Sequence, residues 1–258
     1  MKPSTLTTQR RTESFDIAEH FQRYFAVSPA TTTALKHEVY RLRYDVYCTE
    51  FNYEPQENFP DGMERDEYDS QALHVLVQHK TTGLAAGCTR LITTDPSNSA
   101  APLPFEKYCK DSLNLDYLNE LNLPRQCICE ASRLSVSKNF RRRHGRDGKL
   151  ETYYGNIESS EFGQHEQRTF PFISVSISLA TTALTELTGR PYMFAMMEPS
   201  LPRLLHRIGY DFEQVGKTTD YHGKRAAYLQ ETNAVLQNLR PELRDLYYTI
   251  RESLGEFA

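Results

Sequence analysis

The sequence predicts a single α/β or α+β domain in which helices flank a central sheet. Segments with the alternating pattern of strands and segments with helical spacing follow one another along the chain, which is the first observation behind this class. The second is size, because 258 residues, 39% of them hydrophobic, suffice for one domain with a sizeable core. The net charge of −4 gives no general reason to expect nucleic acid binding.

The first elements of the chain follow a polar stretch. Residues 1–15 are expected to form a flexible N-terminal segment, and residues 21–27 are predicted to form a strand. Arg43 and Tyr47 are four positions apart on the helix predicted next, so they are expected to lie close together on one face. Apolar residues at spacings of four, three and four mark the other face of this helix: Leu35, Val39, Leu42 and Val46.

The middle of the chain is predicted to supply three strands. Residues 73–79 alternate, residues 80–83 have turn chemistry, and residues 84–93 form the partner strand of a hairpin that carries Arg90. Small and branched residues at 127–136 predict a third strand.

The last part of the chain alternates between helices and strands. Apolar residues at helical spacing predict a helix over residues 173–187, which Gly189 and Pro191 then end. The main domain is expected to span residues 16–231, with a C-terminal helical extension at 232–258. The remaining predicted elements are a strand at 192–197, a helix at 199–208, strands at 210–215 and 226–230, and a helix at 243–254.

The cysteines and the absence of long apolar runs indicate where in the cell the protein is located. Five cysteines at irregular spacing argue against a disulfide framework, and no histidine or cysteine partners at ligand spacing accompany them, so no metal is predicted. No apolar run approaches the roughly twenty residues of a membrane span. The first residues lack the apolar segment of a secretory signal, and a cytoplasmic protein is therefore expected.

The order of charged and aromatic residues between positions 41 and 133 resembles that of the LuxI-type autoinducer synthases. Arginines and tyrosines come first, then an acid cluster, then Arg90, and finally Glu130 and Arg133. The resemblance extends over residues 35–230. Within this superfamily, the chain is similar in particular to the exosortase/PEP-CTERM-associated acyltransferases and the N-acyl amino acid synthases. It implies the GNAT acyltransferase fold, with a mixed, mostly antiparallel sheet. It also implies an acyl thioester of acyl carrier protein or coenzyme A as co-substrate, and no other cofactor.

Glu130 and Arg133 are the predicted catalytic residues. An amine attacks a thioester only when it is neutral, and a buried carboxylate can take its proton directly or through one water. In the resembling families the glutamate of Glu-x-Ser-Arg is the proposed base, and Glu130, Ser132 and Arg133 match that motif. Residues three apart on a straight strand face opposite sides, so a β-bulge between Glu130 and Arg133 is expected. An ordinary edge-strand ion pair is the alternative.

The resemblance also implies a charged network around the site that binds the amine, which is the acceptor of the acyl group. Arginine forms two parallel hydrogen bonds with a carboxylate, as an amino acid would require. Tyr53 stands where a tryptophan is usual, Tyr47 where a phenylalanine is usual, and Glu50 where a basic residue is usual. These departures favour an amino acid acceptor over S-adenosylmethionine, while a plain acidic loop at 61–69 is the alternative. The predicted acceptor-binding residues are Arg43, Tyr47, Tyr53, Asp66, Asp69 and Arg90.

A basic run after the third strand is the predicted donor site. Acyl carrier protein is acidic and carries its acyl chain on a phosphopantetheine phosphate, so clustered cations suit it. The glycine-rich pyrophosphate turn of GNAT enzymes is only partly kept here, which favours carrier protein over coenzyme A. A solvated basic loop is the alternative. The predicted donor-binding residues are Ser135, Lys138, Arg141, Arg142, Arg143 and Arg146.

Together these features predict an N-acyltransferase that moves a long fatty acyl group from acyl carrier protein to the α-amine of an amino acid. The apolar helix at 173–187 is a candidate wall of the acyl pocket, although such helices are more often core. Three alternatives stay open. They are an acyl-homoserine lactone synthase that uses S-adenosylmethionine, an acetyl-CoA acetyltransferase, and a non-catalytic regulator that binds lipid or acyl carrier protein.

Overall fold

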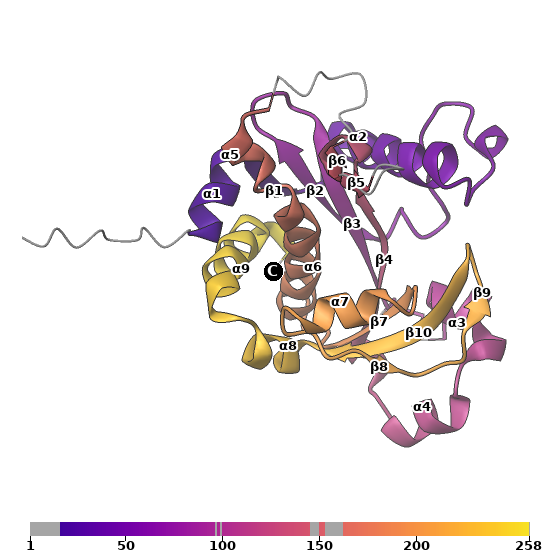
Figure 1. The fold of residues 1–258 in the computed structure, drawn as a ribbon. Helices are drawn as coiled ribbons and strands as arrows, with labels where there is room; N and C mark the ends of the chain where they lie inside the picture. Colours follow the sequence, from indigo (N-terminus) through magenta and orange to yellow (C-terminus); the bar gives the residue numbers. More distant parts are fainter. Residues whose placement is uncertain (1–15, 96, 99, 145–149, 153–161, 258) are drawn as a thin grey trace, which may run out of the picture.

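The computed structural model describes residues 16–95, 97, 98, 100–144, 150–152 and 162–257. The predicted N-terminal segment 1–15 and Arg146 lie outside these residues. Within them, one eight-stranded sheet has the order β1-β2-β3-β4-β7-β10-β8, with β9 paired to β10 (Figure 1). Its strands are β1 (Phe25–Pro29), β2 (Leu73–His79), β3 (Ala85–Thr93), β4 (Ile128–Val136), β7 (Tyr192–Met197), β8 (Glu213–Gln214), β9 (Thr219–Asp220) and β10 (Lys224–Glu231).

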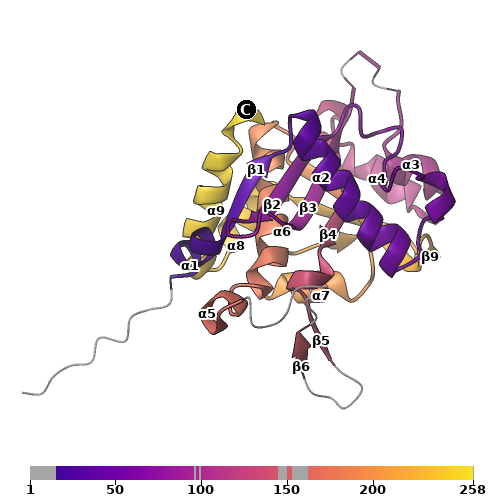
Figure 2. The same cartoon turned by 90° about the horizontal axis from the view of Figure 1, so that it is seen from above.

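Helices cover both faces of the sheet (Figures 1 and 2). Helices α6, α9 and α1 pack together on one face through the largest hydrophobic cluster, and α2 lies against β2 and β3 on the other. Strands β5 (Arg142–His144) and β6 (Leu150–Thr152) form a separate hairpin. The helices are α1 (Ile17–Tyr24), α2 (Thr33–Arg43), α3 (Pro104–Tyr108), α4 (Leu115–Leu121), α5 (Gln164–Gln167), α6 (Pro171–Leu187), α7 (Leu201–His206), α8 (Thr232–Asn238) and α9 (Pro241–Ser253).

The pairing of β4 with β7 is parallel and short. Beyond the last paired residues the two strands separate, which opens the sheet near its centre. The two strands pair only from Ile128 to Ala131, whereas β3 follows β4 along its whole length. A register shift in the β3–β4 ladder, together with a φ of 54° at Arg133, marks a β-bulge in β4. A bulge was predicted between Glu130 and Arg133, and the structure places it at Arg133 itself.

Most predicted elements are confirmed. The hairpin of β2 and β3, the long helix α6, strand β7 and the terminal helix α9 fall within one or two residues of their predicted bounds. Helix α2 is also confirmed, but its chain continues into a π-helix at Tyr44–Glu50, which the periodicity did not reveal.

The strand predicted at 21–27 is wrong in its first half. Residues Ile17–Tyr24 form α1, and the side chain of Asp16 caps this helix by accepting from the Glu19 N–H at 3.0 Å. Phe21 is buried on the apolar face of the helix, so the helical period is visible only when the residues before it are included. The strand begins at Phe25.

The C-terminal helices pack against the core of the domain. Helix α9 contacts both α6 and α1, and its apolar residues Leu243, Leu246 and Ile250 are buried. None of the helices that the structure describes combines the length and the apolar character needed to cross a bilayer.

Candidate active site

Three arginines and three carboxylates form one network, which we call the charged network: Arg43, Arg90 and Arg133 with Glu64, Asp66 and Asp69. Arg43 is fully buried, and its Nη1 and Nη2 donate to Asp69 at 2.6 and 2.9 Å. Its Nε donates to Glu64 at 2.5 Å. Burial alone would raise the pKa of Asp69, but the hydrogen bonds and charge of Arg43 outweigh it and hold that pKa well below its usual range.

Arg90 joins the charged network from β3. Its Nη1 donates to Asp66 at 2.6 Å and to Asp69 at 2.9 Å, and its Nε donates to the hydroxyl of Ser132 at 3.0 Å. The network therefore ties α2, β3 and β4 to the acidic loop at 61–69. Since each buried guanidinium is bonded to a carboxylate, no uncompensated charge is left in the core.

The structure places Arg43 and Arg90 in the interior of the charged network. Both are expected to bind an acceptor, yet both are 1% exposed or less and neither lines the cavity described below. Asp66 and Asp69 are likewise engaged with these arginines. The physical reason is the cost of burying a guanidinium without a partner, which makes these residues parts of the scaffold beneath the site.

Arg133 connects the charged network to the cavity. The bulge turns its side chain toward Glu64, to which Nη2 lies at 3.0 Å, and toward Asp66 at 3.3 Å. The guanidinium also lies over the ring of Tyr47, 5.1 Å from its centroid. The rings of Tyr47 and Tyr53 are 6.0 Å apart, so the structure brings three of the predicted site residues together.

Glu130 lies on the face of β4 that packs against α3. Its carboxylate is 3% exposed and accepts a hydrogen bond from the Phe105 N–H at 2.9 Å, in the first turn of that helix. Burial raises the pKa of Glu130 to about 8, against the opposing effects of the Phe105 N–H and Arg90. Glu130 does not line the cavity, but its neighbours Ala131 and Ser132 do.

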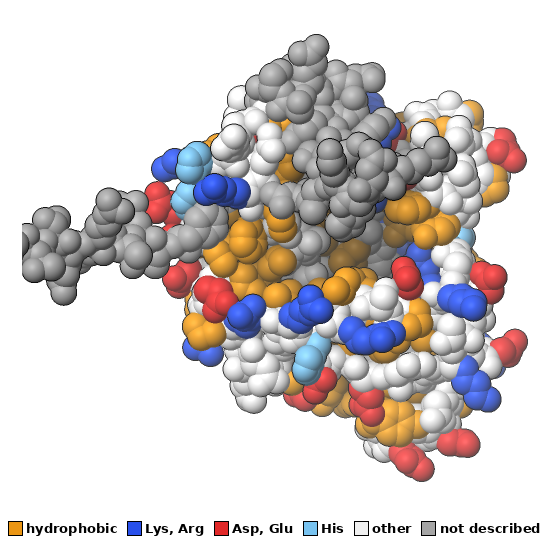
Figure 3. Space-filling view, viewed as in Figure 1, with side chains coloured by type: hydrophobic (Ala, Val, Ile, Leu, Met, Phe, Trp, Pro, Cys, Tyr) orange, Lys and Arg blue, Asp and Glu red, His pale blue; other side chains and the backbone are white. Residues whose placement is uncertain are grey.

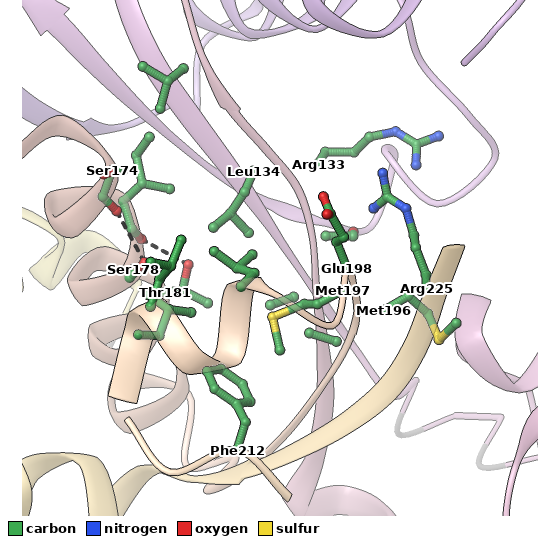
Figure 4. A pocket seen from close by; sticks show the side chains of 18 of the residues that line it. Arg133, Leu134, Ser174, Ser178, Thr181, Met196, Met197, Glu198, Phe212 and Arg225 are labelled. Carbon is green, nitrogen blue, oxygen red and sulfur yellow. Dashed lines mark hydrogen bonds between the residues drawn. The ribbon is translucent and has the colours of Figure 1, made fainter. Parts of the chain in front are cut away.

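A cavity of about 550 Å³ lies where β4 and β7 separate (Figure 4). Helix α6 forms one wall and α7 another, and hydrophobic side chains surround a hollow on this face (Figure 3). Charged side chains of Arg133, Glu198 and Arg225 gather at one end of it (Figure 4). Most other lining residues are apolar, among them Ala131, Leu134, Val136, Ile177, Met193, Ala195, Leu201, Leu205, Ile208 and Phe212.

Sequence reasoning missed Glu198 and Arg225. Arg225 begins β10 and lies over the ring of Tyr53, 5.4 Å from its centroid. Neither residue belongs to a motif, and each is separated from the charged residues at 41–133 by more than sixty positions in the sequence. Only the pairing of β7 with β10 brings them to the cavity.

The basic run is only partly described. Arg142 and Arg143 lie in β5. Arg141 forms an ion pair with Glu50 and lies over the ring of Phe51, 5.4 Å from its centroid. Lys138 is partly buried.

Ser135, a predicted donor-binding residue, is buried in β4. It is 2% exposed and its hydroxyl donates to the Arg133 carbonyl at 3.4 Å. The bulge at Arg133 has the physical effect of turning this hydroxyl back onto its own strand, so Ser135 supports the bulge.

Within the described parts of the chain, no three His, Cys, Asp or Glu side chains are grouped so as to hold a metal ion.

Replacing Arg43 by Gln is expected to lower the free energy of unfolding by about 3–5 kcal/mol, because Glu64 and Asp69 would stay buried without their main cation. The matched control is Arg41→Gln, since Arg41 is exposed and pairs with Glu38 on the surface. That variant is expected to lose less than about 1 kcal/mol. Urea unfolding measures both, and equal losses would contradict a stabilising role for the charged network.

The family described as acetyltransferase (GNAT) domain matches residues 42–149. No curated protein matches the sequence significantly.

Solved structures match over most of the chain. The AHL synthase LasI is 16% identical with a TM-score of 0.54, covering 84% of this chain and 97% of LasI. FeeM, an N-acyl amino acid synthase from uncultured soil microbes, is 11% identical with a TM-score of 0.54, covering 83% of this chain and 94% of FeeM. BjaI, a CoA-dependent acyl-homoserine lactone synthase solved with SAM and isopentyl-CoA, is 18% identical with a TM-score of 0.52 and 89% coverage of both chains. The predicted fold class is confirmed: the chain has a GNAT-like fold.

Proposed function

We propose that this chain is an N-acyltransferase that moves a long fatty acyl group from acyl carrier protein to the α-amine of an amino acid. The observation that carries the proposal is the apolar cavity between β4 and β7, which ends in a group of charged side chains. Its volume of about 550 Å³ lies in the range of small-molecule sites. Each buried methylene contributes about 0.8 kcal/mol, so an alkyl chain suits the apolar part.

The chemistry proceeds at the charged end of the cavity. The amine nitrogen attacks the thioester carbonyl carbon, the C–S bond breaks, and the leaving thiolate takes up a proton to become the thiol of the carrier. The amine gives up its proton to Glu130 through water, because Glu130 does not itself line the cavity, and Glu130 passes it to solvent. A backbone N–H near Arg133 stabilises the oxyanion of the tetrahedral intermediate.

Glu130 is suited to this role by its surroundings. A general base works best when its pKa lies near the working pH, and burial raises the pKa of Glu130 to about 8. Arg133 stands at the bulge, three residues along β4 from Glu130, and lines the cavity. Its charge is balanced by Glu64, so it orients the substrates without repelling the ammonium form of the acceptor.

Acyl carrier protein is the proposed donor because of the basic run at 138–146 and the incomplete pyrophosphate turn. BjaI is described as CoA-dependent, so an acyl-CoA donor is tested beside it. These substrates imply a location in the cytoplasm. Membership of the exosortase-associated branch is part of the proposal, and its support is the motif order at 41–133.

An acyl-homoserine lactone synthase is the second candidate. LasI and BjaI, both described as synthases of this class, have folds similar to that of this chain. The tyrosines at positions 47 and 53 and the absence of tryptophan weigh against it.

The test is a product screen. Purified protein is incubated with carrier protein thioesters or CoA thioesters of several chain lengths, with the twenty amino acids or S-adenosylmethionine in separate arms, and mass spectrometry identifies the products. An N-acyl amino acid is expected. An acyl-homoserine lactone would support the second candidate, and acetyl transfer alone would indicate an acetyltransferase. Carrier protein or lipid binding without any product would indicate a non-catalytic regulator.

Glu130→Gln is expected to fold normally, because the glutamine carbonyl can still accept the hydrogen bond of the Phe105 N–H. The turnover number should fall by about 10²–10⁴-fold, because the general base is lost. The control is Glu67→Gln, which removes the same charge from an exposed residue and should leave turnover unchanged. Near-full activity of Glu130→Gln would exclude Glu130 as the base.

The buried carboxyl also predicts how stability depends on pH. Because the pKa of Glu130 is raised from 4.5 to about 8, the folded protein keeps a proton that the unfolded chain releases. The free energy of unfolding contributed by this group is therefore greatest below pH 4.5 and decreases as pH rises toward 8. Unfolding curves from pH 5 to 9 should show Glu130→Gln gaining stability relative to the wild type as pH rises. Parallel curves would mean that the carboxyl titrates near its ordinary pKa.

A further inference from the structure

Arg225 and Glu198 occupy neighbouring positions at the charged end of the cavity. Ala226 of β10 pairs with Met197 of β7 in an antiparallel register, so the next residues along the two strands are Arg225 and Glu198. Both line the cavity, and Figure 4 shows both charged groups near the Arg133 guanidinium.

The described part of the chain leaves both charges without an ionic partner. Arg225 donates from Nε to the carbonyl of His222 at 3.3 Å and lies over the ring of Tyr53, but no carboxylate of the described residues forms a salt bridge with it. Glu198 is exposed, and among the same residues no cation pairs with it. Arg133 is different, because Glu64 and Asp66 already neutralise it.

Aromatic stacking fixes the two arginines at the same end of the cavity. Arg133 lies over Tyr47 and Arg225 lies over Tyr53, and the two tyrosine rings are 6.0 Å apart. Stacking leaves the edge of the Arg225 guanidinium available for a planar, bidentate partner. A carboxylate has that geometry.

We propose that Arg225 binds the carboxylate of an α-amino acid acceptor and that Glu198 binds its ammonium group. The inference rests on the proposed function and identifies the acceptor class of the same site as a zwitterion. One unpaired cation beside one unpaired anion complements a molecule that carries both charges a few atoms apart. Arg43 and Arg90 are not available for this task, since their nitrogens already bond to Glu64, Asp66 and Asp69.

The test measures the apparent KM of each substrate separately. The acceptor is the amino acid identified by the product screen, and its α-carboxamide is the probe that lacks the carboxylate. Arg225→Gln is expected to raise the acceptor KM about 10- to 100-fold and to leave the donor KM unchanged, with partial rescue by Arg225→Lys. The wild type should prefer the amino acid over its carboxamide, and Arg225→Gln should lose that preference. Glu198→Gln should raise the KM of both molecules, since both keep the ammonium.

Lys224→Gln is the matched control, because it removes one positive charge from the adjacent, exposed position of β10. It should change neither KM. If Arg225→Gln raises the donor KM instead, the arginine binds a phosphate of the donor and the inference is overturned. Unchanged KM values for both substrates would also overturn it and leave Arg225 as a structural partner of Tyr53.

Calorimetric titration with the twenty amino acids separates this inference from the proposed reaction. Binding by the wild type that is lost in Arg225→Gln supports the inference even if no amide is ever formed. If no amino acid binds and none is acylated, both the inference and the proposed function fail. If amides form while Arg225→Gln binds the acceptor normally, only the inference fails.

Discussion

The ion pairs between Arg43 and the carboxylates of Glu64 and Asp69 hold the acidic loop at 61–69 against the sheet, and the surrounding site depends on that loop. A guanidinium with no exposure to water has to find anionic partners, and the chain provides them from a loop that has little regular structure. That loop is thereby fixed against α2 and β3, where it also meets Arg90 and Arg133. The bulge of β4 and the aromatic border of the cavity are therefore positioned by electrostatics as much as by apolar packing.

Two kinds of charge follow from this arrangement. In the charged network, cations and anions balance and are shielded from solvent, so they provide rigidity and little affinity for small molecules. At the end of the cavity, Arg225 and Glu198 occupy neighbouring positions with their charges uncompensated by the described residues. Glu130 is a third case, because its surroundings favour the uncharged acid. The same few types of side chain are thus paired, uncompensated or uncharged according to burial and neighbours.

Much of the fold was predictable because its signals are local. The hairpin of β2 and β3 has alternation and turn residues, and α6 has sustained helical spacing. The residues at 41–133 were also recognisable, but motif membership could not separate buried Arg43 from accessible Arg133, since that difference depends on how strands and loop meet. Arg225 reaches the cavity only through sheet pairing, which no local pattern encodes. Helix α1, which Asp16 caps, was predicted in part as a strand, because its last residues run directly into the apolar start of β1.

The π-helix that follows α2 has a consequence for how this site tolerates change. Seven residues, Tyr44–Glu50, are wound more widely than an α-helix, and Tyr47 lies in their middle. Because a π-helix fits more residues into each turn than an α-helix, deleting one residue here and restoring α winding would leave the residues after Glu50 close to their present direction. The shift would be confined to the turn itself, where Tyr47 borders the cavity, while the hydrophobic face of α2 stayed in place. A one-residue change of length in this turn would therefore alter the border of the cavity without disturbing the core.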